Sequence, residues 1–472
     1  MKLNAQQKQA VEYTGGPLMI IAGAGTGKTT VITEKIKWLI AEQNLNPSEI
    51  LALTFTEKAA REMEERVDLA LPIGYSQLWI STFHSFCDRV LKDEAIQIGL
   101  NPNFKLMTGA ETIFFLQKNL FDFKLNYFRP NSNPNKFLSA LASHFSRLQD
   151  EDIDPKQYLT FAKKMPDSSP EEKLEKQKTI ELATVFDQYQ KAKEKEGLLD
   201  FADLISQTIK LFRQRANVLS EYRKRFRFVL IDEFQDTNIA QYELIKLLAP
   251  PKSKPNLTVT GDDSQAIYKF RGAAISNILA FKQDYPDSQM VVLSQNYRST
   301  QAILDSAYQL IKYNDPDTLE AKLGISKNLT SARKIKGQTP KLIFENQAET
   351  EADMIVKTIK RLHQGKEKYQ FKDFAILVRA NSQADLVCQV LSRAQVPNQF
   401  LGPSQLFRQT EIKELVAYLS LLANPQDDLA FFKVASMDIF DIPEKNLALL
   451  RGFAKKTICL SLKQPKKVKI QT

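Results

Sequence analysis

The residues best suited to chemistry lie near the start of the chain, where positions 22–29 read Ala-Gly-Ala-Gly-Thr-Gly-Lys-Thr. An apolar run precedes this stretch and helical periodicity follows it, so a glycine loop joins a buried strand to a helix. Backbone N–H groups of such a loop bind phosphate oxygens. Lys28 can reach the β- and γ-phosphates, and the Thr29 hydroxyl can hold Mg²⁺. The stretch predicts a nucleoside triphosphate site made by Ala22, Gly23, Ala24, Gly25, Thr26, Gly27, Lys28, Thr29 and Thr30.

A carboxylate pair stands where such a site needs one, at the end of another expected strand. Asp232 and Glu233 directly follow the apolar run 228–231. Asp232 would help to hold Mg²⁺, and Glu233 would accept the proton of the attacking water. The long separation between Thr29 and Asp232 requires a large insertion, which the segment 88–195 supplies.

Two further strand ends carry polar candidates. Gln265 follows the run 257–260, and its uncharged amide suits sensing of a γ-phosphate or orienting of water. Arg298 follows the run 290–293, and its guanidinium could stabilise charge on the transferring phosphoryl group. The neighbouring Tyr297 could stack on a base. Taken alone, each of these side chains could equally be structural.

The elements that must position these residues alternate between expected strands and expected helices. Short apolar runs, each followed by a helical stretch, lie at 18–21, 50–55, 78–82, 228–231, 257–260 and 290–293. This alternation predicts an α/β fold with a parallel sheet covered by helices, and with functional groups at the carboxyl ends of the strands. Helical periodicity dominates 88–195, which predicts an inserted helical subdomain. A second α/β segment follows residue 300, with strands expected at 341–344 and 374–379.

Composition limits the classes of protein that fit. The 472 residues carry a net charge of +10, which favours a polyanionic partner, although a solvated lysine-rich surface gives the same excess. The three cysteines form neither a disulfide framework nor a zinc pattern. No apolar run approaches the ~20 residues of a membrane helix. These features predict a cytoplasmic protein without a membrane partner.

Several segments match, in order, the motifs of one family. They are residues 22–30, 51–63, 81–85, 232–237, 261–273 and 295–299, with shorter matches at 3–7, 197–201, 379–383 and 407–413. Together they resemble the UvrD/Rep/PcrA family of superfamily 1 DNA helicases, over residues 3 to about 435. The resemblance implies P-loop, RecA-like parallel-sheet motor domains with inserted all-helical subdomains.

The resemblance also implies a domain order. The first RecA-like domain would comprise 1–87 and 196–285, with 88–195 as its inserted helical subdomain. A partial second RecA-like domain would span 286–404, and 405–472 would begin a second, truncated helical subdomain.

The activity implied is that of an ATP-dependent helicase that moves 3′ to 5′ on single-stranded DNA, with ATP and Mg²⁺ as cofactors, in DNA repair or replication. Its partners would be single-stranded DNA and junctions of single- and double-stranded DNA, bound as a monomer or a DNA-induced dimer; no protein partner is predicted. Gln7 would read adenine and Tyr297 would stack on it. The catalytic residues implied are Lys28, Asp232, Glu233, Gln265 and Arg298.

Contacts to DNA are expected from aromatic and polar side chains beside the ATP motifs, because stacking tolerates any base sequence. The residues implied are Phe55, Thr56, Phe83, His84, Tyr268, Phe270 and Arg271. An aromatic residue near a strand end can instead belong to the core. Stacking alone does not distinguish RNA from DNA, and the resemblance favours DNA.

The sequence departs from the family at three points. Phe270 stands where the family usually has tryptophan, and Ser264 stands where it usually has a carboxylate. No second arginine motif follows residue 413, in a family whose members continue further. An alternative function is therefore a C-terminally truncated fragment that binds ATP and DNA with weak ATPase and no unwinding. A helicase–nuclease motor is a third reading, and no sequence feature supports it.

Overall fold

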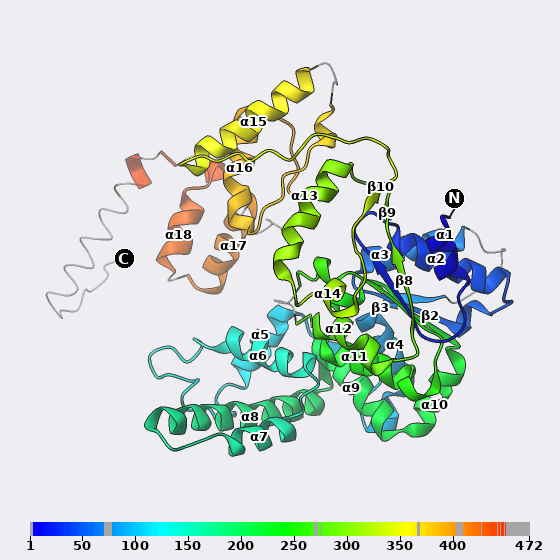
Figure 1. Ribbon diagram of the computed structural model, residues 1–472. Helices are drawn as coiled ribbons and strands as arrows, with labels where there is room; N and C mark the ends of the chain where they lie inside the picture. The colour runs from blue at the N-terminus through cyan, green and yellow to red at the C-terminus, as the bar shows by residue number, and fades with distance from the viewer. Residues whose placement is uncertain are drawn as a thin grey trace, which may run out of the picture. The chain divides into compact units, whose positions relative to one another are not determined.

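The computed structural model describes residues 3–69, 78–268, 272–273, 275–365, 369–402, 409–425, 427–440, 442–443, 445–447 and 449. The chain divides into two compact units, Met1–Pro340 and Lys341–Thr472. Figure 1 shows the course of the chain through the elements named below. Within the described residues, no helix is both long enough and apolar enough to cross a membrane.

A six-stranded sheet forms the centre of the first unit, in the order β3-β2-β6-β7-β1-β8. All neighbouring strands are parallel. The strands are β1 (Leu18–Ala22), β2 (Ile50–Thr54), β3 (Trp79–Thr82), β6 (Phe228–Ile231), β7 (Leu257–Gly261) and β8 (Gln289–Leu293). Each coincides with an apolar run in the sequence to within a residue or two, so the predicted α/β fold is confirmed.

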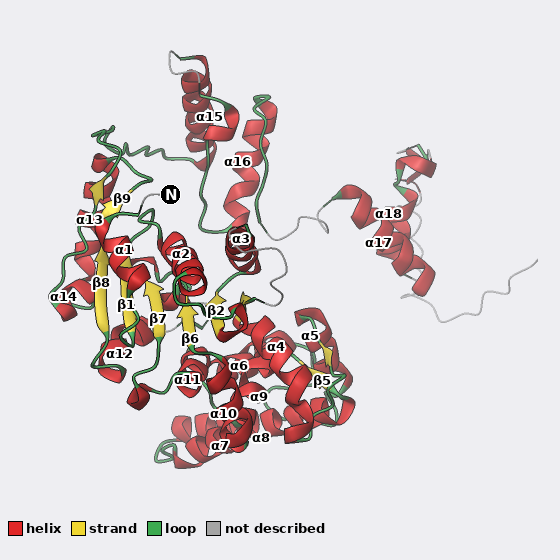
Figure 2. Ribbon diagram, turned by 90° about the vertical axis from the view of Figure 1, so that its right-hand side faces the viewer, coloured by secondary structure: helices red, strands yellow, loops and turns green. Residues whose placement is uncertain are grey.

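Helices cover both faces of this sheet, as Figure 2 shows. Alternate strand residues supply two separate cores, with Met19 and Ile21 in one and Leu18 and Ile20 in the other. Burial on both faces explains why the strands read as continuous apolar runs. The helices are α1 (Ala5–Glu12), α2 (Lys28–Ala41), α3 (Glu57–Asp68), α4 (Phe83–Glu94), α9 (Phe201–Gln214), α10 (Ala216–Arg225), α11 (Ile239–Leu248) and α12 (Ile275–Asp284).

The segment between α4 and α9 is largely helical and has its own hydrophobic core, which includes Phe115, Phe145 and Phe186. Its helices are α5 (Gly109–Lys118), α6 (Leu138–Asp150), α7 (Pro155–Lys164) and α8 (Pro170–Glu196). Two short parallel strands, β4 (Lys105–Leu106) and β5 (Leu198–Leu199), pair where this segment begins and ends. The segment is thus helical as expected, apart from β4.

Strand β8 pairs with β1 and so completes the first sheet. The expected domain boundary at residue 286 lies just before this strand and stays a prediction. The remainder of the first unit contains β9 (Gln295–Asn296), α13 (Gln301–Ile311), α14 (Leu319–Leu323) and β10 (Thr330–Ser331). The short strands β9 and β10 pair in parallel. The other domain boundaries stay predictions.

The second unit contains helices whose apolar faces pack in pairs. Helices α15 (Ala348–Gln364) and α16 (Asn381–Arg393) share one small core, and α17 (Thr410–Ala423) and α18 (Asp428–Ala435) share another. The strands expected at 341–344 and 374–379 are not formed. A strand needs a neighbour for its backbone groups, and within the described residues these two segments pair with none. Leu342 and Leu377 are consequently 90% and 96% exposed.

Short 3₁₀ helices complete the described elements. They are η1 (Pro47–Glu49), η2 (Ala95–Ile98), η3 (Phe234–Asp236), η4 (Pro251–Ser253), η5 (Asp263–Gln265), η7 (Lys312–Asn314), η8 (Phe371–Asp373) and η10 (Asp438–Phe440).

Candidate nucleotide site

The phosphate loop joins β1 to α2 in the arrangement that the sequence predicts. The strand ends at Ala22, and the helix begins at Lys28. Gly25 and Gly27 take φ values of +79° and +90°, which side-chain-bearing residues rarely adopt. The loop can therefore turn its N–H groups toward a ligand at the helix N-terminus, where the helix dipole favours an anion.

Lys28 contacts polar groups from two other strand ends. Its buried Nζ donates hydrogen bonds to Glu233 Oε2 at 2.6 Å and to Gln265 Oε1 at 3.1 Å. Thr29 Oγ1 donates to Asp232 Oδ2 at 3.1 Å. Four of the predicted catalytic residues thus meet around the phosphate loop, at the shared edge formed by the carboxyl ends of parallel strands.

The carboxylate of Asp232 is buried and firmly held. Its Oδ1 accepts hydrogen bonds from Thr260 Oγ1 at 2.6 Å and from the Glu233 backbone N–H at 3.0 Å. Burial, and next the negative charge of Glu233, raise the pKa of Asp232. A cation would therefore be stabilising here. Glu233 has a φ of 51°, an uncommon backbone conformation of the kind that concentrates at functional sites.

Gln235 links the carboxylate pair to the loop that carries Gln265. Its Nε2 donates to Glu233 Oε2 at 2.7 Å, and its Oε1 accepts from the Asp262 backbone N–H at 3.0 Å. Asp262 Oδ2 in turn accepts from Gln265 Nε2 at 2.7 Å. Gln235 lies inside a matched motif, but its amide had no role in the sequence-based assignment.

Residues at the end of β9 and directly after it contact the phosphate loop. Asn296 Nδ2 donates to the Ala24 carbonyl at 2.6 Å, and the Tyr297 N–H donates to the Gly25 carbonyl at 2.9 Å. A Cβ added at Gly25 would lie 2.6 Å from Cβ of Arg298. The backbone of Arg298 is thus placed against the loop, although its side chain is exposed. Asn296 is a bridging residue that the sequence did not single out.

The segment expected to read adenine lies beside the same loop. Gln7 Nε2 donates to the Thr26 carbonyl at 3.0 Å, and Gln7 Oε1 accepts from the Asn4 N–H at 3.1 Å. Asn4 Nδ2 donates to Tyr297 Oη at 2.9 Å. Gln7 and Tyr297, both predicted to contact the base, are therefore joined through Asn4, whose role the sequence did not reveal.

The residues expected to contact DNA fall into different environments. The rings of Phe55 and Tyr268 lie 5.2 Å apart between centroids and are half-buried. The His84 ring lies against Phe201 at 6.0 Å, and burial lowers its pKa. Phe83 is 2% exposed within the main core, so it offers no free face to a base, and we remove it from the expected contacts.

Two residues beside these aromatic side chains have capping and bridging roles. Thr56, expected on DNA, caps α3 by accepting from the Ala59 N–H at 3.1 Å. Glu57 Oε1 accepts from the hydroxyls of Thr82 and Ser85, at 2.7 Å each, and these bonds hold the pKa of Glu57 below its usual value. Glu57 therefore joins the segments 51–63 and 81–85. The expected DNA contacts Phe270 and Arg271 lie outside the described residues.

Comparison with known proteins places this site in a family. The family described as UvrD/REP helicase N-terminal domain matches residues 3–286, and the UvrD-like helicase C-terminal domain matches residues 291–469. The chain is 37% identical over 454 residues to the ATP-dependent DNA helicase PcrA of Bacillus subtilis (strain 168), covering 96% of this chain and 57% of that protein. It is 37% identical over 453 residues to PcrA of Staphylococcus aureus (strain Mu50), covering 96% and 58%.

The chain thus spans somewhat more than half the length of these curated relatives. The N-terminal domain of this family alone matches most of the chain. The match includes every residue around Lys28 described above except those after β8. The chain belongs to the UvrD/REP helicase family.

Proposed function

We propose that this chain forms the ATP-hydrolysing part of a DNA helicase that moves 3′ to 5′ on single-stranded DNA, in DNA repair or replication. One observation carries the proposal: Lys28 lies within hydrogen-bond distance of both Glu233 and Gln265, which come from two other strand ends. A lysine, a carboxylate and an amide so arranged suit binding of a γ-phosphate, proton transfer from water and orientation of that water.

Thr29 and Asp232 fit the Mg²⁺ ion that accompanies ATP. Mg²⁺ is commonly bound by one or two protein oxygens together with phosphate oxygens and water. The Thr29 hydroxyl and the Asp232 carboxylate already lie together, and the raised pKa of Asp232 reflects a buried charge that a cation would offset. When bound, the ion would neutralise charge on the phosphates.

Binding of ATP requires Lys28 to exchange partners. Its ammonium would leave Glu233 for the phosphates, because the triphosphate carries more negative charge than one carboxylate. The Glu233 carboxylate then becomes available to accept a proton from water, while Gln235 keeps its hydrogen bond to Glu233 Oε2. In this proposal the γ-phosphate competes with Glu233 for Lys28, and this competition frees the base.

Single-stranded DNA is the proposed track. The net charge of +10 favours a polyanion, and Phe55 and Tyr268 form an aromatic pair beside the strand ends that carry the ATP residues. The relatives from Bacillus subtilis and Staphylococcus aureus are named ATP-dependent DNA helicases, which supports the same activity.

The test is ATP hydrolysis with and without single-stranded DNA, for the unaltered chain and for Lys28→Ala. We expect DNA to stimulate hydrolysis in the unaltered chain and to have no effect in the variant. Stimulation that persists in Lys28→Ala would contradict the proposal. Unwinding of duplexes with a 3′ or a 5′ single-stranded tail tests the direction, and a preference for the 5′ tail would contradict it.

A second candidate is a protein that binds ATP and DNA but hydrolyses ATP slowly and does not unwind DNA. The unpaired segments at 341–344 and 374–379, with exposed Leu342 and Leu377, favour it for this chain by itself. Unwinding of a tailed duplex by this chain alone would exclude this candidate.

A further inference from the structure

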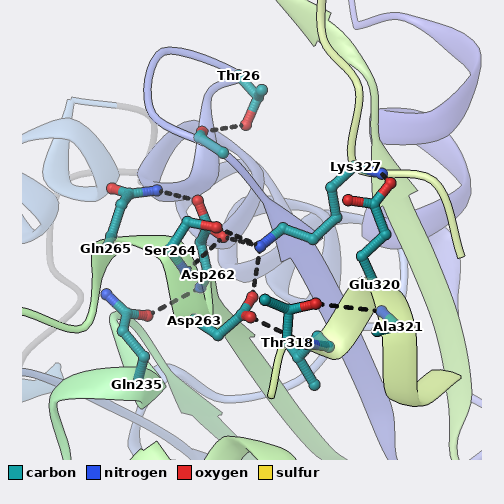
Figure 3. A network of polar contacts seen from close by, with 12 residues as sticks. Thr26, Gln235, Asp262, Asp263, Ser264, Gln265, Thr318, Glu320, Ala321 and Lys327 are labelled. Atoms are coloured by element: carbon teal, nitrogen blue, oxygen red, sulfur yellow. Dashed lines mark hydrogen bonds and ion pairs between the residues drawn. The ribbon is translucent and has the colours of Figure 1, made fainter. Parts of the chain in front are cut away.

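Lys327 occupies a partly buried position between α14 and β10. Its side chain is 10% exposed, and its Nζ lies 2.5 Å from Asp262 Oδ1 and 2.7 Å from Ser264 Oγ. It also contacts Asp263 Oδ1. Figure 3 shows the ammonium group between these three side chains, which all come from the loop after β7.

The chemistry of this cluster requires a cation. The side chains of Asp262 and Asp263 are only 6% and 3% exposed, and two adjacent buried carboxylates are costly without a counter-charge. Burial opposes the charged form of Lys327, but the carboxylates outweigh it and its pKa is raised. Lys327 in turn helps to hold the pKa of Asp262 below its usual value. Asp263 Oδ2 also accepts from the Leu319 N–H at 2.9 Å, which fixes the start of α14.

The cluster reaches the ATP site through Asp262. The oxygen of Asp262 not held by Lys327 accepts from Gln265 Nε2 at 2.7 Å. The other end of the Gln265 amide accepts from Lys28 Nζ at 3.1 Å. Lys327 therefore fixes the carboxylate that sets the direction of the Gln265 amide.

The residues that follow Lys327 in the chain contact the segment around Arg298. Strand β10 begins at Thr330 and pairs with β9, which ends two residues before Arg298. Ser331 Oγ donates to the Ser299 carbonyl at 2.7 Å, and Arg333 Nη1 donates to the Arg298 carbonyl at 3.1 Å. A shift of the chain at Lys327 would thus be passed to the backbone of Arg298.

We propose that Lys327 is a positioning residue that couples Gln265 to the backbone of Arg298. Through this coupling, the Gln265 loop and the Arg298 segment respond together to a γ-phosphate. The proposal rests on the proposed ATPase function and adds a positioning residue to it. It predicts that loss of Lys327 slows turnover more than it weakens ATP binding.

The experiment compares Lys327→Met, Lys327→Arg and the control Lys322→Met in the full chain. Lys322 pairs with Asp317 at the surface, so the control removes one lysine charge nearby without touching the cluster. Two measurements are made: amide hydrogen exchange of the segments 262–266 and 295–299, and kcat and KM for ATP. Exchange reports on the coupling without requiring activity.

We expect Lys327→Met to accelerate exchange in both segments and to lower kcat by about tenfold or more with a smaller change in KM, as for loss of other residues that orient catalytic groups. Lys327→Arg should lie closer to the unaltered chain than Lys327→Met in both measurements. The control should match the unaltered chain.

Exchange confined to one segment, or a control that behaves like Lys327→Met, would overturn the proposal. If Lys327→Met does not fold, the double variant Lys327→Met with Asp263→Asn removes one of the buried carboxylates left without a cation and makes the same test. An unaltered chain without ATPase activity would refute the proposed function, and exchange would still decide the role of Lys327.

Discussion

The ammonium of Lys28 lies 2.6 Å from the carboxylate of Glu233, so the proposed phosphate-binding lysine and the proposed general base form an ion pair. Each group therefore neutralises the charge of the other, and a γ-phosphate must compete with Glu233 for the lysine. Replacement of Glu233 should therefore change ATP binding and catalysis in opposite directions.

Glu233→Gln should abolish most hydrolysis while preserving or strengthening ATP binding. The amide cannot accept the proton of water, and loss of a general base costs about 10²- to 10⁴-fold in rate. Lys28 no longer has a carboxylate partner, so the phosphates meet less competition. Measurement of kcat and of Kd for a fluorescent ATP analogue checks both effects. Glu62→Gln, which removes an exposed carboxylate paired with Arg66, is the control and should alter neither value.

Gly25→Ala should disrupt the contact between the phosphate loop and residues 296–298. Alanine at a left-handed φ costs about 1–2 kcal/mol, and here its Cβ would also lie 2.6 Å from Cβ of Arg298. We expect a loss of ATP binding together with a lower free energy of unfolding, measured by nucleotide titration and urea denaturation. Gly324→Ala is the matched control, because Gly324 has a φ of +63° with nothing within 4 Å of the added Cβ. Equal destabilisation by both variants would show that only backbone strain matters.

Asp150 should make stability depend on pH. It lies at the end of α6, and its Oδ1 accepts from Asn238 Nδ2 at 2.8 Å. Burial raises the pKa of Asp150 from 3.8 to about 6. The folded state therefore binds a proton more readily than the unfolded state, and this group makes the free energy of unfolding fall as pH rises from about 4 to about 6.

Asp150→Asn should remove that part of the pH dependence. Its amide oxygen can still accept from Asn238, and the variant should be more stable than the unaltered chain above pH 6, by on the order of 2 kcal/mol. Urea denaturation at a series of pH values provides the measurement, and Asp122→Asn, at an exposed site, is the control. Parallel stability curves for the unaltered chain and Asp150→Asn would contradict the assignment.

The sequence predicts the central sheet and the cluster of side chains around Lys28 because both follow from local patterns. Continuous apolar runs mark strands that are buried on two faces, and a parallel sheet brings their carboxyl ends to one edge. Lys28, Asp232 and Gln265 consequently meet as expected, despite more than two hundred positions between the first two.

Other features depend on tertiary neighbours that a local pattern does not contain. The apolar runs at 341–344 and 374–379 resemble strands, but a strand forms only with a partner. Asn296 and Lys327 acquire their roles from side chains and carbonyls that are distant in sequence. Phe83 follows a strand as Phe55 does, and only the packing distinguishes the two.

Phe55 and Phe83 provide the sharpest test of the DNA contacts, because the same substitution should affect DNA binding at one position and stability at the other. Phe83→Ala removes a ring from the main core and should lower the free energy of unfolding by about 3–5 kcal/mol. Phe55→Ala removes a half-buried ring paired with Tyr268 and should mainly weaken single-stranded DNA binding, by about 1–3 kcal/mol. Urea denaturation and fluorescence anisotropy of a labelled oligonucleotide separate these effects. If Phe55→Ala lost stability without losing DNA affinity, this ring would belong to the core as Phe83 does, and the proposed DNA track would lie elsewhere.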